Sequence, residues 1–117
     1  MKFDNNIPIY LQIMEDIKEK IINGTLTEDE KLPSIRAYCI HYQVTSLTMQ
    51  RAISELEREG ILIIQKGIGS FVVKGIVKKL KVQTSKKLTK TFVTNMTNFG
   101  FTKQEILGNI KEELKDE

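Results

Sequence analysis

The sequence predicts a mainly α-helical protein with a small β-hairpin, in which a winged helix-turn-helix is followed by a two-helix C-terminal hairpin. Two helical patterns are separated only by Gln43 and Val44, and so short a turn between helices is typical of the helix-turn-helix. Directly after Gly60 the apolar pattern changes from a helical to a β period. Two further amphipathic patterns follow Gly75. We therefore expect a winged-helix domain over residues 1–75 and a separate two-helix region over residues 76–117.

The composition favours a small foldable domain. The 117 residues include 40% hydrophobic and 28% charged residues, which leaves room for one domain and an appendage but not for a large catalytic α/β fold. No apolar run approaches the ~20 residues of a membrane span, and the first residues show no signal-peptide pattern. A single cysteine cannot form an internal disulfide. We therefore expect a cytoplasmic protein without a membrane partner.

The first helix is predicted from Pro8 to Asn23. Proline fits a first helical turn, and Asn23 with Gly24 supplies a stop. Residues 24–33 lack a period and indicate a surface loop. Apolar residues recur every three or four positions along this helix and should form a wide stripe facing a core: Ile9, Tyr10, Ile13, Met14, Ile17 and Ile21.

The second and third helices each begin with a capping residue. Ser34 is the expected N-cap of a helix that ends near Tyr42 and Gln43, and Thr45 is the expected N-cap of a helix that ends before Gly60. Val44 should be buried between them. Their inward faces are predicted to carry Ile35, Tyr38, Cys39 and Tyr42, and then Met49, Ala52, Ile53 and Leu56.

A β-hairpin is predicted over residues 61–73. Two β-branched apolar runs, 61–64 and 70–73, flank the sequence Lys66-Gly67-Ile68-Gly69. The two glycines suit a turn with positive φ and allow another backbone to approach closely. A helix-turn-helix followed by such a hairpin is a winged helix.

The C-terminal region is predicted to form two helices that pack on a second copy of the chain. One helix runs from about Val77 to Phe99 and ends at Gly100, and Thr102 with Glu105 forms a capping box at the start of the last helix. The apolar stripes are too wide for so small a hairpin to hide. The expected dimer interface consists of Leu88, Phe92, Met96, Phe99, Ile106, Ile110 and Leu114.

Acidic and basic residues are segregated along the chain. No acidic residue occurs from Lys31 to Ser54, and none from Gly60 to Gln104, although nine lysines fall in the second stretch. Such segregation is typical of a surface that faces a polyanion, whereas a solvated helix face is the commoner explanation of any one lysine cluster. The lysines beyond residue 76 are best explained as such a solvated face.

The candidate contacts with double-stranded DNA lie on the second helix, the third helix and the wing. Ser34 and Arg36 could hold a phosphate at a helix N-terminus, the alternative being a cap and a solvated arginine. Gln50 could pair with adenine and Arg51 with guanine, the alternative being an ordinary polar surface. The complete set is Ser34, Arg36, Thr45, Ser46, Thr48, Gln50, Arg51, Lys66, Gly67 and Gly69.

Catalytic, metal and cofactor sites are not expected. Cys39 and His41 could each bind a metal, but two ligands two residues apart on a helix point to different faces. With one histidine, one cysteine and no recognisable carboxylate pair, nucleophilic or metal-assisted chemistry lacks its parts. We therefore predict that the chain is not an enzyme and uses no cofactor, and the sequence indicates no particular small-molecule effector.

The ordered motifs resemble the GntR family of bacterial transcription regulators, and the short C-terminus resembles its YtrA-type branch. The resemblance is carried by Pro8–Ile13, by Gly24-Thr25-Leu26 through Leu32–Arg36, by Val44-Thr45 and Thr48–Ala52, by Leu56–Gly60, and by the wing Gly67–Val72. It implies a winged-helix repressor that binds an operator as a homodimer. The chain departs from the family pattern at Ser46 and Ile68, where relatives often carry arginine, and both changes remove a donor to DNA.

These observations predict a sequence-specific DNA-binding transcription regulator that binds a palindromic operator as a homodimer. A winged-helix module that binds a protein is the alternative, favoured by Leu47 and Ile68 as exposed apolar residues. Arg36, Gln50 and Arg51 in an acid-free region favour DNA. An RNA-binding module is a weaker alternative because the chain lacks the aromatic platform that single strands use.

Overall fold

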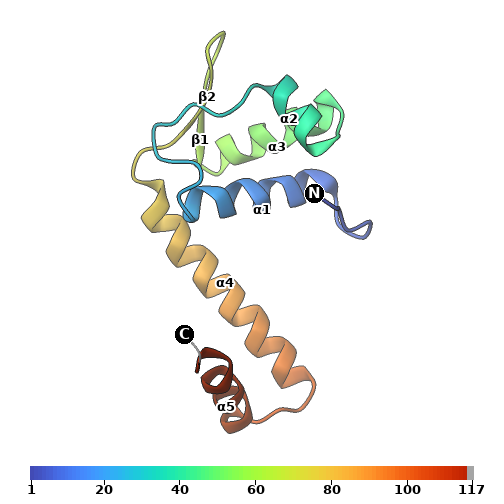
Figure 1. Ribbon diagram of the computed structural model, residues 1–117, viewed down its shortest axis with the longest axis vertical. Coiled ribbons are helices and arrows are strands. Elements are labelled where there is room, and N and C mark those ends of the chain that lie inside the picture. The colour runs from blue at the N-terminus through green and yellow to red at the C-terminus, as the bar shows by residue number, and fades with distance from the viewer. Residues whose placement is uncertain (116–117) are drawn as a thin grey trace. The chain divides into compact units, whose positions relative to one another are not determined.

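The computed structural model describes residues 1–115 and confirms the predicted mainly helical class with a β-hairpin (Figure 1). Residues 116 and 117, the end of the predicted C-terminal region, lie outside the described residues. The elements follow in the order α1 (Ile9–Ile22), α2 (Ile35–Tyr42), α3 (Ser46–Arg58), β1 (Leu62–Gln65), β2 (Gly69–Val72), α4 (Ile76–Asn98) and α5 (Lys103–Leu114).

The chain divides into two compact units, Met1–Lys81 and Val82–Glu117. The start of α4 therefore packs with the winged helix, because Ile76 and Leu80 of this helix belong to the buried core of the first unit. The predicted division of functions, with DNA binding by residues 1–75 and dimerisation by residues 76–117, stays a prediction.

The core of the first unit forms where α1 packs against α3 (Figure 1). Both helices are amphipathic, so each removes one apolar face from water by packing on the other. Tyr38 and Tyr42 of α2 and Leu62 and Val72 of the hairpin complete the core. The buried residues of these two helices are Ile13, Met14, Ile17 and Ile21 from α1, and Met49, Ala52, Ile53 and Leu56 from α3.

The turn between α2 and α3 has the predicted length and caps. Gln43 ends α2 in a left-handed conformation with φ of 56°, and its backbone N–H donates to the Cys39 carbonyl. The Val44 N–H also donates to the Cys39 carbonyl, at 3.1 Å. Thr45 then caps α3 by accepting a hydrogen bond from the Thr48 N–H. Two capped ends joined by this turn fix the direction of α3.

A polar contact inside the first unit joins α2 to α1. The Tyr42 hydroxyl, on a side chain only 2% exposed, donates to Asp16 Oδ2 at 2.6 Å. The Lys20 ammonium group donates to the same carboxylate and lies 5.8 Å from the centre of the Tyr42 ring. Partial burial would raise the pKa of Asp16, but hydrogen bonds from Lys20 and Tyr42 outweigh it and hold the pKa below its usual value. Burial and the Asp16 carboxylate raise the pKa of Tyr42.

The hairpin pairs in antiparallel register, with Leu62 opposite Val72 and Gln65 opposite Gly69. Gly67 and Gly69 have φ of 79° and 147°, which confirms the predicted positive φ. The segment before α2 runs beside β2, because the Leu32 N–H donates to the Ser70 carbonyl at 2.8 Å. The wing is therefore held on its β2 side by backbone hydrogen bonds.

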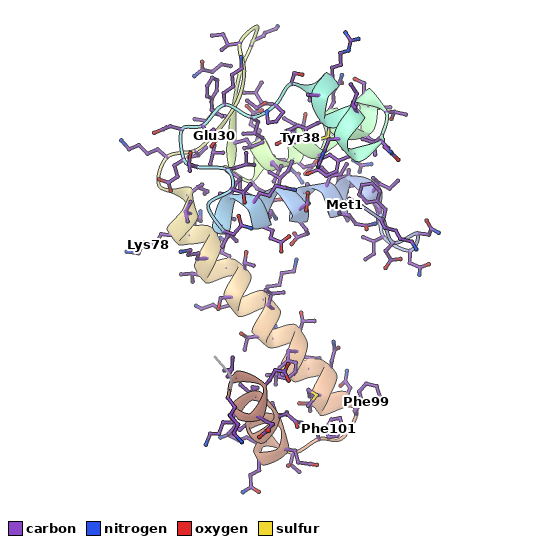
Figure 2. All side chains as sticks on the ribbon, in the orientation of Figure 1. Met1, Glu30, Tyr38, Lys78, Phe99 and Phe101 are labelled. Atoms are coloured by element: carbon purple, nitrogen blue, oxygen red, sulfur yellow. The ribbon has the colours of Figure 1, made fainter. Side chains whose placement is uncertain are left out.

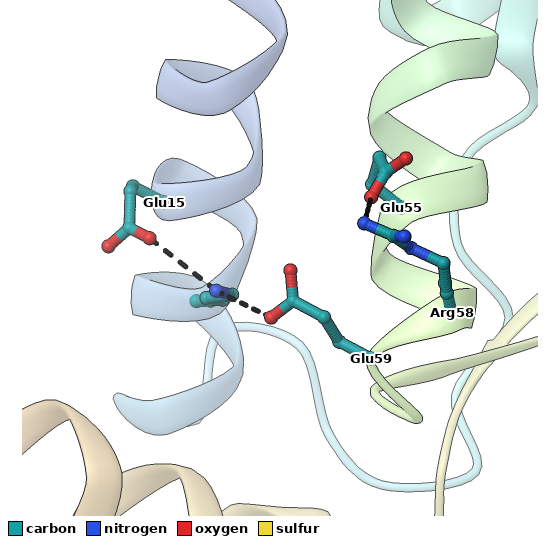
Figure 3. Close-up of polar contacts among 5 residues, drawn as sticks. Glu15, Glu55, Arg58 and Glu59 are labelled. Atoms are coloured by element: carbon teal, nitrogen blue, oxygen red, sulfur yellow. Dashed lines mark hydrogen bonds and ion pairs between the residues drawn. The ribbon is translucent and has the colours of Figure 1, made fainter.

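An ion pair on the surface of the first unit links α1 to the end of α3 (Figure 3). Lys18 Nζ lies 3.0 Å from a carboxylate oxygen of Glu59 and 3.5 Å from one of Glu15. Exposed pairs of this kind contribute less than ~1 kcal/mol to the free energy of unfolding. Apolar burial therefore supplies most of the α1–α3 contact.

The predicted end of α4 and the predicted capped start of α5 are both confirmed. Gly100 has φ of 88°, and Thr102 forms the predicted capping box with Glu105. The Thr102 N–H donates to Glu105 Oε1 at 2.9 Å, and the Glu105 N–H donates to Thr102 Oγ1 at 3.1 Å. Ile106 is buried next to this cap. Among the described helices, none has both the length and the apolar character that a membrane crossing requires.

Several residues that were predicted to lie in the core are less buried than expected. Ile9 is 42% exposed although it lies on the predicted apolar stripe, because this stripe is wider than the surface that α3 covers. Tyr10, Ile35, Cys39 and Val44 are half-buried at the margin of the core rather than enclosed by it. His41, in contrast, is exposed as expected for a surface residue, and its ring meets the ring of Tyr42 edge-on with centroids 4.7 Å apart.

We predict that Tyr42→Phe lowers the free energy of unfolding by about 1.5–3 kcal/mol at pH 7, the range for a hydrogen bond to a charged group. The Asp16 pKa is lowered in the folded chain, so this contribution is present at neutral pH and is lost as pH falls below about 4. Urea unfolding at several pH values measures both effects. Tyr38→Phe, which removes the hydroxyl of a buried tyrosine on the same helix that does not bond to Asp16, is the control, and an equal loss in both variants would contradict the assigned role of Asp16.

Candidate nucleic-acid interface

The N-terminus of α2 carries the predicted phosphate-binding residues. Ser34 Oγ accepts a hydrogen bond from the Ala37 N–H at 3.1 Å and so fixes the first turn. Arg36 is the second residue of this helix and is exposed. The positive end of the helix dipole and a nearby guanidinium group suit a phosphate oxygen. The structure therefore presents Arg36 beside a capped helix start.

The polar face of α3 is exposed as predicted. Burial of the opposite face of α3 leaves Ser46, Gln50 and Arg51 exposed to solvent, and Thr48 half-buried. The Thr45 hydroxyl both caps the helix and donates to Thr48 Oγ1 at 3.2 Å. Gln50 Nε2 donates to Ser46 Oγ at 2.9 Å. The first two turns of α3 thus present hydroxyl and amide groups in a fixed arrangement.

Arg51 has a partner that sequence reasoning missed. Its guanidinium carbon lies 3.9 Å from the centre of the Tyr10 ring, and its Nη2 donates to the Tyr10 hydroxyl at 3.3 Å. Stacking on an aromatic ring restricts an arginine that would otherwise sample many rotamers. The apolar repeat of the first helix predicts that Tyr10 lies in the core. A tyrosine at the edge of such a stripe, however, has a polar end that can reach a neighbouring helix.

A groove runs between the start of α1 and the outer face of α3. Leu47, which is 77% exposed, and Ile9 give it an apolar edge. The residues that line the groove are Ile9, Tyr10, Leu47, Thr48, Gln50, Arg51 and Ser54.

The wing presents Lys66 and Gly67 at the exposed turn between β1 and β2, and Gly69 follows as the half-buried first residue of β2. A Cβ atom at Gly69 would lie 2.8 Å from Lys31 Cε, a flexible side-chain end that can move, so the positive φ is the stronger reason for glycine at this position. Glu57 of α3 accepts a hydrogen bond from the Ile64 N–H at 3.0 Å. The wing is thereby attached to the C-terminal end of α3.

The second unit has a large exposed apolar surface. Leu88, Phe92, Phe99 and Leu114 of the predicted interface are exposed, with Leu88 at 65% and Phe99 at 82%. The other three predicted interface residues differ in burial: Met96 and Ile110 are half-buried and Ile106 is buried within its own chain. Phe99 and Phe101 lie close together at the connection between α4 and α5, with ring centroids 6.4 Å apart (Figure 2).

Comparison with known families and sequences gives a consistent result. The family of bacterial regulatory proteins described as the gntR family matches residues 9–72. The chain is 38% identical over 112 residues to the uncharacterized HTH-type transcriptional regulator YhcF of Bacillus subtilis, covering 94% of this chain and 93% of that protein. It is 35% identical over 68 residues to the transcriptional repressor YtrA of Bacillus subtilis, covering 58% of this chain and 52% of YtrA.

Solved structures agree with this result. A GntR family transcriptional regulator from Listeria monocytogenes superposes with a TM-score of 0.88 at 32% identity, over 94% of this chain and 98% of that chain. The DNA-binding domain of AraR in complex with operator ORX1 superposes with a TM-score of 0.56 at 31% identity, over 57% of this chain and 81% of that chain. With its winged helix, its matched motifs and its regulator relatives, the chain is a transcriptional regulator rather than an enzyme, and it belongs to the gntR family of bacterial regulatory proteins.

Proposed function

We propose that the protein is a repressor that binds a palindromic operator as a homodimer, with α3 in the major groove of each half-site. The observation that carries this proposal is the exposed polar face of α3, flanked by the capped start of α2 and by the glycine-containing wing. A helix presented in this way fits the major groove, where base edges carry distinct donor and acceptor patterns.

The residues divide into those that position the protein and those that read bases. Ser34 and Arg36 face the sugar-phosphate backbone from the start of α2, and Lys66 with the wing glycines contacts a neighbouring phosphate or the minor groove. Gln50 reads adenine, and Thr48 contacts a thymine methyl group or a phosphate. Arg51 reads guanine when it leaves its stack on Tyr10. The AraR domain bound to its operator supports duplex DNA as the partner.

The exposed apolar residues of the second unit support homodimerisation. Soluble proteins rarely leave so many large apolar side chains in water, and a twofold contact covers the same patch on both copies. A dimer must place its two recognition helices ~34–36 Å apart to reach successive major grooves, so a palindromic operator follows.

A protein-binding winged helix is the second candidate. Leu47 and Ile68, which are 77% and 60% exposed, could pack on a protein surface. In the proposed function the same side chains contact thymine methyl groups or sugar edges.

We predict that Arg36→Ala weakens binding to every duplex to a similar extent, whereas Gln50→Ala relaxes the preference at one base pair of each half-site by about 1–3 kcal/mol. Selection from a random duplex pool, followed by binding measurements across a salt series, measures both effects. Arg58→Ala, at an exposed arginine near the end of α3, is the matched control. Failure of the unmodified chain to enrich any duplex at low salt would favour the protein-binding candidate.

We predict that Phe92→Asp converts the protein to a monomer with weak operator binding and an intact winged helix. The substitution would place an unpaired carboxylate in an apolar contact, which is costly. Thr91→Asp adds the same charge at the neighbouring exposed position of α4 and should leave the dimer unchanged. Analytical ultracentrifugation measures the oligomeric state, and an unchanged dimer in the Phe92 variant would move the interface elsewhere.

A further inference from the structure

The start of α4 is capped by a residue that lies 49 positions earlier in the chain. Gly75 precedes the helix with φ of 84° and has no side chain to offer. Glu28, in the segment between α1 and α2, accepts a hydrogen bond from the Val77 N–H at its Oε2, at 3.0 Å. The backbone N–H groups of Val77 and Gly75 hold the pKa of Glu28 below its usual value. A side-chain oxygen at the second N–H of a helix does the work of an N-cap.

Glu28 is held in place by its neighbours in sequence. The Thr27 N–H and hydroxyl both donate to Glu30 Oε1, each at 2.9 Å. Two backbone hydrogen bonds then tie this segment to β2, from the Asp29 N–H to the Val72 carbonyl at 2.9 Å and from the Val72 N–H to the Glu30 carbonyl at 3.0 Å. The Glu28 side chain therefore extends from a segment that is fixed to the wing.

The backbone of Asp29 has an unfavourable conformation that the neighbouring hydrogen bonds hold in place. It adopts φ of 66°, a left-handed conformation that costs free energy for a residue other than glycine. The two flanking hydrogen bonds to Val72 compensate for this cost. The resulting bend separates Glu28, which caps α4, from Glu30, which turns back to Thr27.

The first turns of α4 are fixed by both the cap and apolar packing. Ile76 and Leu80 are buried in the core of the first unit, on the same helix that receives the hydrogen bond at Val77. The helix has 23 residues, so it is about 34 Å long. A tilt of about 10° at the start of a helix of this length corresponds to a displacement of about 6 Å at its far end, which is close to the length of about two base pairs of DNA.

We propose that Glu28 is a positioning residue that fixes the direction in which α4 leaves the winged helix, and thereby sets the operator half-site spacing that the homodimer accepts. This inference rests on the proposed function, because spacing has a meaning only for a dimer that binds two half-sites. Glu28 makes no contact with DNA in this account. It connects β2 of the wing, through residues 28–30, to the helix that carries the dimer interface.

The first test measures the cap in the full chain without DNA. Glu28→Ala should raise the hydrogen-exchange rate of the Val77 amide about fivefold, the factor that corresponds to loss of a typical N-cap. Glu28→Gln retains an acceptor oxygen and should restore part of the protection. Glu19→Ala removes an exposed glutamate of α1 and should leave the Val77 amide unchanged. An unchanged exchange rate of the Val77 amide in Glu28→Ala would contradict the role of Glu28 as the cap of α4.

The second test measures spacing, using selection from duplexes that contain two half-sites and a central spacer of random length. The unmodified chain and Glu19→Ala should enrich one spacer length, whereas Glu28→Ala should enrich several lengths with the same half-site sequence. A variant that was only less stable would lose affinity at all spacings alike, and a spacer preference that stays sharp would overturn the positioning role. If the unmodified chain enriches only single half-sites, the proposed dimeric function is wrong, and so is the role of Glu28 in spacing. The exchange rate of the Val77 amide still shows whether Glu28 caps α4.

Discussion

The packing of α1 against α3 is the contact on which the rest of the structure depends. An amphipathic helix can remove only one face from water, and α3 buries the face that carries Met49 and Leu56. Its opposite face, with Ser46, Gln50 and Arg51, is consequently exposed over the first two turns. The same apolar contact that stabilises the fold thus selects which side chains are available to a partner. A change that rotated α3 about its axis would bury the polar face and expose the core.

Polar contacts between distant residues orient the elements that surround this core. Tyr42 donates to Asp16 and so holds α2 on α1, while Glu57 accepts from Ile64 and holds the wing on α3. Glu28 connects the segment beside β2 to the start of α4. In each contact a carboxylate accepts a hydrogen bond from a donor that lies far away in sequence or in another element. Such bonds contribute modestly to stability, but they restrict direction more strongly than apolar contacts do, because hydrogen bonds depend on angle.

Local signals in the sequence predict the elements well because the signals act within a few residues. Ser34, Thr45 and the pair Thr102 and Glu105 cap helices as expected, because a cap depends only on the adjacent turn. The glycines of the wing have positive φ for the same reason. A strict apolar repeat likewise predicts the four buried residues of α3.

Contacts between distant residues could not be predicted in this way. Neither the stack of Arg51 on Tyr10, across 41 residues, nor the cap of α4 by Glu28, across 49 residues, leaves a periodic or short-range trace in the sequence. The exposure of Ile9 also depends on how far α3 extends beside α1, which the pattern of α1 alone does not contain. The composition of residues 24–33 indicates a loop, but not that Asp29 bends it left-handed to direct Glu28 at another helix.

In the proposed function, the exposed face of α3, together with the start of α2 and the wing, is the surface that binds duplex DNA. Hydrogen–deuterium exchange of the full chain, with and without its selected duplex, tests this claim most directly. We expect slower exchange at residues 34–37, 45–51 and 66–69 when the duplex is bound, and unchanged exchange in the second unit. Slower exchange confined to α5, with residues 45–51 unaffected at saturating duplex, would contradict it.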